Sequence, residues 1–160
     1  MPRIPRILIV SDVPGWAYDN VSASFMKELQ QDFKFYKVYA QDLPVIDHHS
    51  YDLIYCMYWR SDFLQRNLIP KEKCCVQVAS FWSWQKNDQL TPAQLVEQYL
   101  NKACAVSVNC PGLYDLISPL HPNVFLNPSG VDSEKFHPQP PRSTKNEAVL
   151  TVGWAGSTAA

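Results

Sequence analysis

Apolar residues in this chain come in short continuous runs separated by polar segments. Five such runs occur, at residues 7–10, 53–57, 74–79, 104–108 and 123–126. Continuous apolar runs of this length are typical of strands that are buried on both faces, as in parallel sheets. Residues 33–39 instead alternate lysines with aromatic and apolar residues, and therefore predict a more exposed strand.

Helical spacing fills several of the intervals between these strands. Phe25, Met26 and Leu29 recur on one face, which predicts a helix ending near residue 31. Asn20 or Ser22 is the expected cap of this helix. Shorter helices are expected at residues 61–68 and 111–117.

The best-marked helix begins at Thr91. Threonine as cap, Pro92 at the first helical position and Gln94 three residues after the cap form a capping box, which satisfies otherwise unpaired backbone N–H groups. The expected core face of this helix consists of Leu95, Val96, Tyr99, Leu100 and Ala103. Strands and helices thus alternate, which predicts an α/β fold with a Rossmann-like, doubly wound parallel sheet in three α/β/α layers.

Composition fits one domain of this kind. The chain has 160 residues, of which 46% are hydrophobic and 18% are charged, as expected of a globular protein with a real core. A formal net charge of -1 gives no support for a nucleic-acid partner. No apolar run approaches the length needed to span a bilayer, and the first residues do not resemble a signal peptide, so a cytoplasmic protein is expected.

The five cysteines indicate buried, reduced thiols rather than a metal site. Cys74 and Cys75 are adjacent in a predicted strand, so their side chains point to opposite faces and do not serve one ion well. No Cys-x-x-Cys spacing occurs, and His48 and His49 lie in a polar connection. The sequence therefore predicts no bound metal.

Ligands of doubly wound sheets bind at the carboxyl ends of the strands, so the loops there are the candidate sites. The loop after the first strand contains Gly15, which permits close approach of a ligand, and the aromatic residues Trp16 and Tyr18. With only one glycine between bulky neighbours, sugar stacking is a better expectation than phosphate binding. A turn with two packing aromatics is an equally weighted alternative.

A second candidate loop follows the fourth strand. Ser80, Phe81 and Trp82 are the expected substrate contacts, because flat aromatic faces suit the C–H surfaces of carbohydrates and an indole N–H adds a polar handle. The alternative is that these aromatics seal the edge of the core. That alternative has more weight for Phe81 than for Trp82 and Trp84.

Two further strand ends carry polar residues. Asn109 is expected to cap the helix at residues 111–117, with contact to a hydroxyl of a bound ligand as its secondary role. Arg60 follows the third strand and offers a bidentate phosphate contact. An exposed ion pair with Asp62 or another acid is the commoner arrangement for such an arginine.

The chain changes character after residue 126. Pro128 lacks a backbone N–H and Gly130 tolerates positive φ, which predicts a sharp turn after the last strand. Residues 138–146 are polar and proline-rich, as in an extended linker. A new apolar run at residues 149–152 then leads into a glycine-containing loop that includes Gly153, Trp154, Gly156 and Ser157.

This junction resembles that of the retaining glycosyltransferases of group 1, which have the GT-B fold. The family pattern reads proline, asparagine, glycine, valine, aspartate, then phenylalanine and proline. Gly130, Val131, Asp132, Phe136 and Pro138 match it, and Ser129 replaces the asparagine. The resemblance implies an N-terminal, acceptor-binding domain at residues 1–138, a linker at 139–147 and the start of a donor-binding domain at 148–160.

The same resemblance implies a function. Family members transfer a sugar from a nucleotide-diphosphate sugar to an acceptor hydroxyl with retention and without an obligatory metal or other cofactor. Gly153, Trp154, Gly156 and Ser157 hold the place of the donor loop. Ser80 and Phe81 stand where many relatives have a histidine, and the sequence identifies no catalytic residue. The implied partners are a sugar or glycolipid acceptor, the nucleotide sugar and a peripheral membrane contact, with residues 1–160 alone expected to be inactive.

A binding module is the main competing reading. Such a domain would recognise a carbohydrate or a lipid-linked acceptor without catalysis, or would pair with a separate donor-binding chain. A flavodoxin-like regulator or nucleotide binder is disfavoured, since the chain has no dinucleotide fingerprint or Walker loop.

Overall fold

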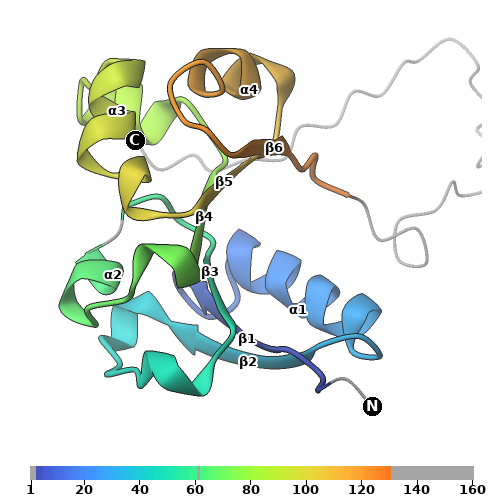
Figure 1. Ribbon diagram of the computed structural model, residues 1–160. Helices are drawn as coiled ribbons and strands as arrows, with labels where there is room; N and C mark the ends of the chain where they lie inside the picture. The colour runs from blue at the N-terminus through green and yellow to red at the C-terminus, as the bar shows by residue number, and fades with distance from the viewer. Residues whose placement is uncertain (1–2, 61, 131–160) are drawn as a thin grey trace, which may run out of the picture. The chain divides into compact units, whose positions relative to one another are not determined.

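A six-stranded parallel sheet forms the centre of the computed structural model, which describes residues 3–60 and 62–130 (Figure 1). The strand order is β2-β1-β3-β4-β5-β6. The strands are β1 (Arg6–Ser11), β2 (Lys34–Tyr39), β3 (Leu53–Cys56), β4 (Cys74–Val78), β5 (Ala105–Val108) and β6 (Val124–Leu126). All six expected strands are present, so the prediction of a Rossmann-like parallel α/β sheet is confirmed.

The helices lie in the connections between these strands. They are α1 (Ala17–Leu29), α2 (Asp62–Arg66), α3 (Pro92–Gln98) and α4 (Pro111–Ile117), with a π-helix, η4, at Trp82–Asn87. Short 3₁₀ turns occur at η1 (Ala40–Asp42), η2 (His48–Ser50), η3 (Lys71–Lys73) and η5 (Leu100–Lys102). In Figure 1, α1 lies on one side of the sheet, and α2 and α3 lie on the other.

The two longest connections test the capping predictions differently. The Thr91 side chain accepts a hydrogen bond from the Gln94 N–H, and the Gln94 side chain returns to the Thr91 backbone, which confirms the capping box of α3. The predicted cap of α1 is wrong. Trp16 is the N-cap and makes no side-chain cap bond, while Asn20 and Ser22 lie inside the helix.

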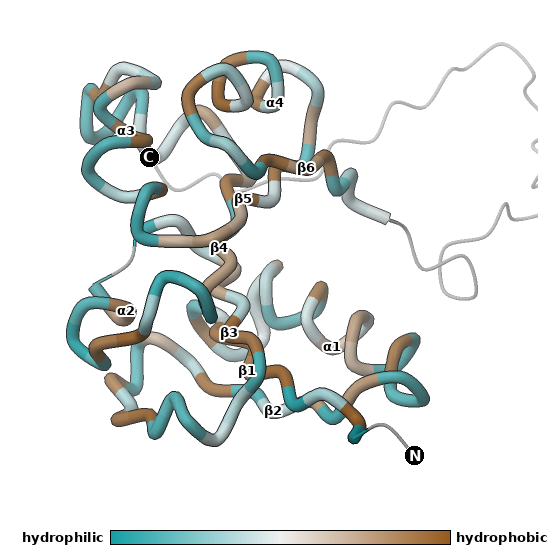
Figure 2. The backbone as a smooth tube through the Cα atoms, viewed as in Figure 1, coloured by the Kyte–Doolittle hydropathy of each residue, from teal (hydrophilic) through white to brown (hydrophobic). Residues whose placement is uncertain are grey.

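The hydrophobic core lies between the sheet and the helices α2, α3 and α4. Every second strand residue points into it, including Val10, Ile54 and Val76. Leu95 of α3 and Leu113 of α4 close it from the helix side, both with no exposed area. Figure 2 shows how the hydrophobic residues follow strands β1, β3 and β6. This packing fixes the strand ends that carry the candidate loops.

The cysteines are free thiols, as the sequence predicts. Cys56, Cys74 and Cys75 are buried, and Cys104 and Cys110 are half-buried. A hydrogen bond with Cys56, together with burial, raises the pKa of the Cys74 thiol. The Cys74 thiol therefore stays protonated at neutral pH and acts as a small apolar core residue.

None of the helices formed by residues 3–60 and 62–130 has the length and apolar character that crossing a membrane requires.

The turn predicted near Gly130 is not of the expected kind, because Gly130 does not have positive φ. Gly15 is the one glycine of the described part of the chain that has positive φ. The linker at 139–147 and the segment at 148–160, with Gly153, Trp154, Gly156 and Ser157, lie outside the described residues.

Candidate binding site at the carboxyl ends of the strands

The candidate loops meet at one edge of the sheet. After β1 the chain crosses to β2 on one side, whereas β3 leads to β4 on the other side. Connections that leave in opposite directions open a crevice between the carboxyl ends of β1 and β3, which is where doubly wound sheets bind ligands. Residues 11–18, 58–60, 80–88 and 109 border this edge.

Gly15 forms the turn between β1 and α1. Its φ is 77°, and a Cβ built there would meet no atom within 4 Å, so the backbone is open to solvent or ligand. The Gly15 N–H is nevertheless occupied, since it donates to Asp19 Oδ2 at 2.8 Å. A carboxylate at this helix start opposes a second anion, so the loop favours a neutral ligand over a phosphate.

Asp19 ties this loop to the neighbouring strand. Its carboxylate accepts hydrogen bonds from Lys37 and, at 2.9 Å, from the Tyr39 hydroxyl. The bonds from Lys37, Gly15 and Tyr39 lower the pKa of Asp19 from 3.8 to about 2. Asp19 is therefore ionised at neutral pH, and its role is to hold the loop in place.

The two aromatics of the first loop have different surroundings. Trp16 is 65% exposed, so its indole is available to a ligand. Tyr18 is half-buried, and burial, with a smaller contribution from Asp12, raises its pKa to about 12. The Trp16 indole is therefore accessible for stacking on a sugar, whereas Tyr18 packs against the protein, as in the alternative prediction.

A small cavity of about 40 Å³ lies between the ends of β1 and β3. Ser11, Asp12 and Tyr58 contribute to its wall, and Asp12 Oδ1 is buried without a hydrogen-bond partner among the described residues. Burial raises the pKa of Tyr58. A space of this size holds a water molecule rather than a sugar. The unpaired Asp12 oxygen is one of the polar acceptors at this edge.

Arg60 also lines this cavity, but its charge is already balanced. Its guanidinium donates to Asp88 Oδ1 at 3.0 Å, so the expected ion pair forms with Asp88 and not with Asp62. The second oxygen of Asp88 is buried without a partner among the described residues. The pair links the ends of β3 and the π-helix.

The segment after β4 is a π-helix, which the sequence reading treated as a loop. Trp82 is 62% exposed, with the Lys86 ammonium 5.1 Å from its ring centroid. Trp84 has no exposed area, so the core-sealing alternative, which had less weight for this residue, describes it correctly. The Trp59 indole donates to Ser83 Oγ at 2.9 Å and anchors the π-helix. π-helical turns of this kind are frequent at functional sites.

The remaining predicted contacts have mixed outcomes. Phe81 is half-buried, with its ring 6.1 Å from that of Trp84 and close to Gly112, which fits the core-sealing alternative. Ser80 is exposed. Asn109 does not cap α4, whose N-cap is Cys110. The Asn109 amide instead donates to the Ala79 carbonyl at 2.8 Å and joins the ends of β4 and β5.

Residues 3–60 and 62–130 bring no three His, Cys, Asp or Glu side chains together in the way that a metal ion requires.

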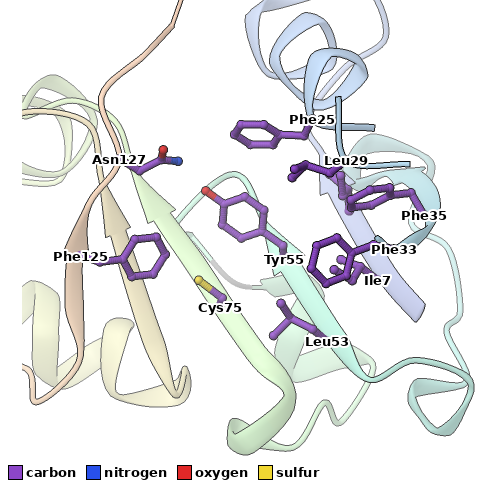
Figure 3. Close-up of a pocket in the computed structure, with 11 residues that line it drawn as sticks. Ile7, Phe25, Leu29, Phe33, Phe35, Leu53, Tyr55, Cys75, Phe125 and Asn127 are labelled. Atoms are coloured by element: carbon purple, nitrogen blue, oxygen red, sulfur yellow. The ribbon is translucent and has the colours of Figure 1, made fainter. Parts of the chain in front are cut away.

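Two features of the molecule were not predicted from the sequence. Asp88 carried no local signal, because its partner Arg60 is distant in sequence. A large apolar cavity on the α1 side of the sheet was missed because its residues come from separate strands (Figure 3).

Comparison with known proteins gives no further guide to this site. No protein-family model matches the chain. No curated protein has a sequence similar to it at a significant level.

Proposed function

We propose that this chain is the acceptor-side domain of a retaining glycosyltransferase that uses a nucleotide-diphosphate sugar. The observation that carries the proposal is the pair of exposed indoles, Trp16 after β1 and Trp82 after β4, at the ligand-binding edge of a parallel sheet. The junction motif at Gly130 and beyond supports it from the sequence. The GT-B assignment and a cytoplasmic location belong to the same proposal.

The placement of the indoles suits a carbohydrate. One strand, β3, separates β1 from β4, so the two strands lie about 10 Å apart at the usual spacing. Indole faces contact the apolar C–H surface of a sugar, and nearby polar atoms bind its hydroxyls. The exposed Ser80 hydroxyl is a polar group of this edge that can contact an acceptor.

We assign nucleotide binding to residues outside this edge of the sheet. The Gly15 N–H is engaged by Asp19 and Arg60 is engaged by Asp88, so neither is ready to hold a diphosphate. The donor therefore stays with Gly153, Trp154, Gly156 and Ser157, as the family resemblance implies. Transfer needs the leaving diphosphate held beside the acceptor in a closed cleft.

A non-catalytic carbohydrate-binding or partner-pairing module is the second candidate. The cation–π pair of Lys86 and Trp82 favours it, because the ammonium on one face of the ring holds this exposed indole in place. Acceptor binding alone does not separate the two candidates. Addition of a nucleotide sugar does, since only a glycosyltransferase produces a new glycosidic bond when its donor half is supplied.

Ligand-observed NMR on the full 160-residue chain tests the proposed site. Simple glycans are expected to bind, and Trp16→Ala and Trp82→Ala should each weaken that binding about twofold to tenfold. Tyr114→Ala, which removes an exposed aromatic from α4, is the matched control and should change little. Tight binding of a nucleotide-diphosphate sugar to this chain, with no glycan binding, would contradict the proposal.

A further inference from the structure

A cavity of about 340 Å³ lies on the α1 side of the sheet (Figure 3). Eleven described residues line it, and none of them is charged. Phe25 and Leu29 come from α1, whereas Leu53, Tyr55 and Cys75 come from β3 and β4. The volume falls within the range of about 300–1,000 Å³ that is usual for small-molecule sites.

The strand residues at the base of this cavity are buried, whereas residues at its rim are exposed. Ile9 is 1% exposed and Cys75 is 5% exposed, so the strands below are held by their neighbours. On the rim, Leu29 is 41% exposed and Phe125 is 42% exposed. A large apolar hollow with exposed aliphatic and aromatic edges is typical of a surface that binds an apolar partner.

One end of the cavity is polar. Figure 3 shows the Asn127 amide directed toward the Tyr55 hydroxyl, which donates to Gln77 Oε1 at 3.0 Å. Tyr55 and Asn127 supply the hydroxyl and amide groups among the described residues that line the cavity. Burial raises the pKa of Tyr55 to about 12, so the Tyr55 hydroxyl is neutral near pH 7, as is the Asn127 amide.

We propose that this cavity binds a single-chain amphiphile with an uncharged polar head. The hydrocarbon chain lies between Phe25 and Leu29 of the helix and the strand residues beneath them. A hydroxyl or carbonyl of the head meets the polar end formed by Tyr55 and Asn127. An ionised head is disfavoured, because its desolvation would find no opposite charge among the lining residues. The inference does not depend on the proposed glycosyltransferase function.

Calorimetry with monolauroylglycerol, held below the concentration at which it forms micelles, tests this site on the full chain. Saturable binding with one molecule per chain is expected. Laurate and dodecyltrimethylammonium carry the same chain with a negative or a positive head, and should bind at least about tenfold more weakly. Equal binding of the three amphiphiles would overturn the proposal.

Two matched variants locate the binding. Leu29→Gln keeps a good helix former but places an amide on the rim, and should weaken binding about threefold to tenfold. Leu116→Gln changes an equally exposed leucine of α4, 40% against 41%, outside the cavity, and should leave binding unchanged. An equal loss in both variants would indicate non-specific adsorption and contradict the site.

A third variant tests the polar end. Asn127→Leu should reduce the preference for monolauroylglycerol over laurate while chain binding persists. An unchanged preference would remove the role assigned to Asn127. If none of the three amphiphiles binds, but an amphipathic helical peptide does, the cavity is a helix-docking groove and the proposal is wrong.

Discussion

The helices on the two faces of the sheet are packed to different extents. On the face with α3 and α4, helix residues such as Leu95, Leu113 and Ile117 have no exposed area. On the opposite face, Ser22 is the one buried residue of α1, and a cavity of about 340 Å³ lies beside that helix. The first face therefore supplies the stability, and the second leaves apolar surface available for binding.

The same contrast separates the helix starts. The helix α3 has a complete capping box, whereas α1 begins at Trp16 with no side-chain cap. A tryptophan at this position forgoes a hydrogen bond that serine or aspartate would provide. Residues at binding edges often depart from the locally most stable choice, and Trp16 fits that pattern.

Truncation of a helix residue on each face should show the largest difference. Leu113→Ala removes a fully buried side chain from the core and should cost about 2–5 kcal/mol in the free energy of unfolding. Met26→Ala removes a half-buried side chain of α1 and should cost about 1 kcal/mol. Urea unfolding of the two variants measures both values. Equal losses would mean that the two faces are packed alike.

Substitutions at the starts of α3 and α1 should change the stability by smaller amounts and in opposite directions. Thr91→Ala should destabilise the protein by about 1 kcal/mol, because the Gln94 N–H loses its acceptor. Trp16→Ser supplies a cap that α1 lacks and should stabilise the protein by about 0.5–1 kcal/mol while it weakens glycan binding. Chemical denaturation and NMR titration of the same samples check both effects. A destabilised Trp16→Ser variant would show that the indole is a packing residue.

Acid should act on the first loop through Asp19. Its pKa is lowered from 3.8 to about 2 in the folded protein, so its ionised form stabilises the fold at pH values above about 4. This contribution is lost as the pH falls from about 4 to 2, since the carboxylate then takes up a proton. Asp19→Asn should flatten the pH dependence of the unfolding free energy in that window. An unchanged acid profile would show that the bonds to Lys37 and Gly15 are not coupled to stability.

The smallest expected change in stability is at the second indole. Trp82 is 62% exposed, so Trp82→Ala should alter the free energy of unfolding by less than about 0.5 kcal/mol. Thermal unfolding of the variant checks this value. A loss of several kcal/mol would place the side chain in the core, where Trp84 lies, and would remove it from the binding edge.

The fold could be predicted from sequence because its signals are local. Continuous apolar runs located five of the six strands, an alternating pattern located β2, and the Thr91-to-Gln94 pattern located the start of α3. The cap of α1 was missed because Asn20 and Ser22 are equally good caps by type. Ser22 instead bonds the Asp19 carbonyl at 2.7 Å and meets Ser11 inside the structure.

The site could be predicted only in outline. Strand order explains why the loops meet at one edge, but not which aromatic faces solvent. Trp82 and Trp84 are two residues apart in the same segment, and π-helical geometry exposes one and buries the other. The Asn109 amide bonds Ala79 across two strands, a contact that no local pattern indicates. Tertiary packing decided each of these outcomes.

Backbone amide chemical shifts of the 160-residue chain, titrated separately with a simple glycan and with monolauroylglycerol, test the division of roles most directly. The glycan should shift residues around Gly15, Trp16 and Trp82, and the amphiphile should shift residues around Leu29 and Asn127. Two separate sets of shifted residues would confirm that the two regions bind different ligands. If a nucleotide sugar shifts the Gly15 loop and the glycan does not, the acceptor-domain account is wrong.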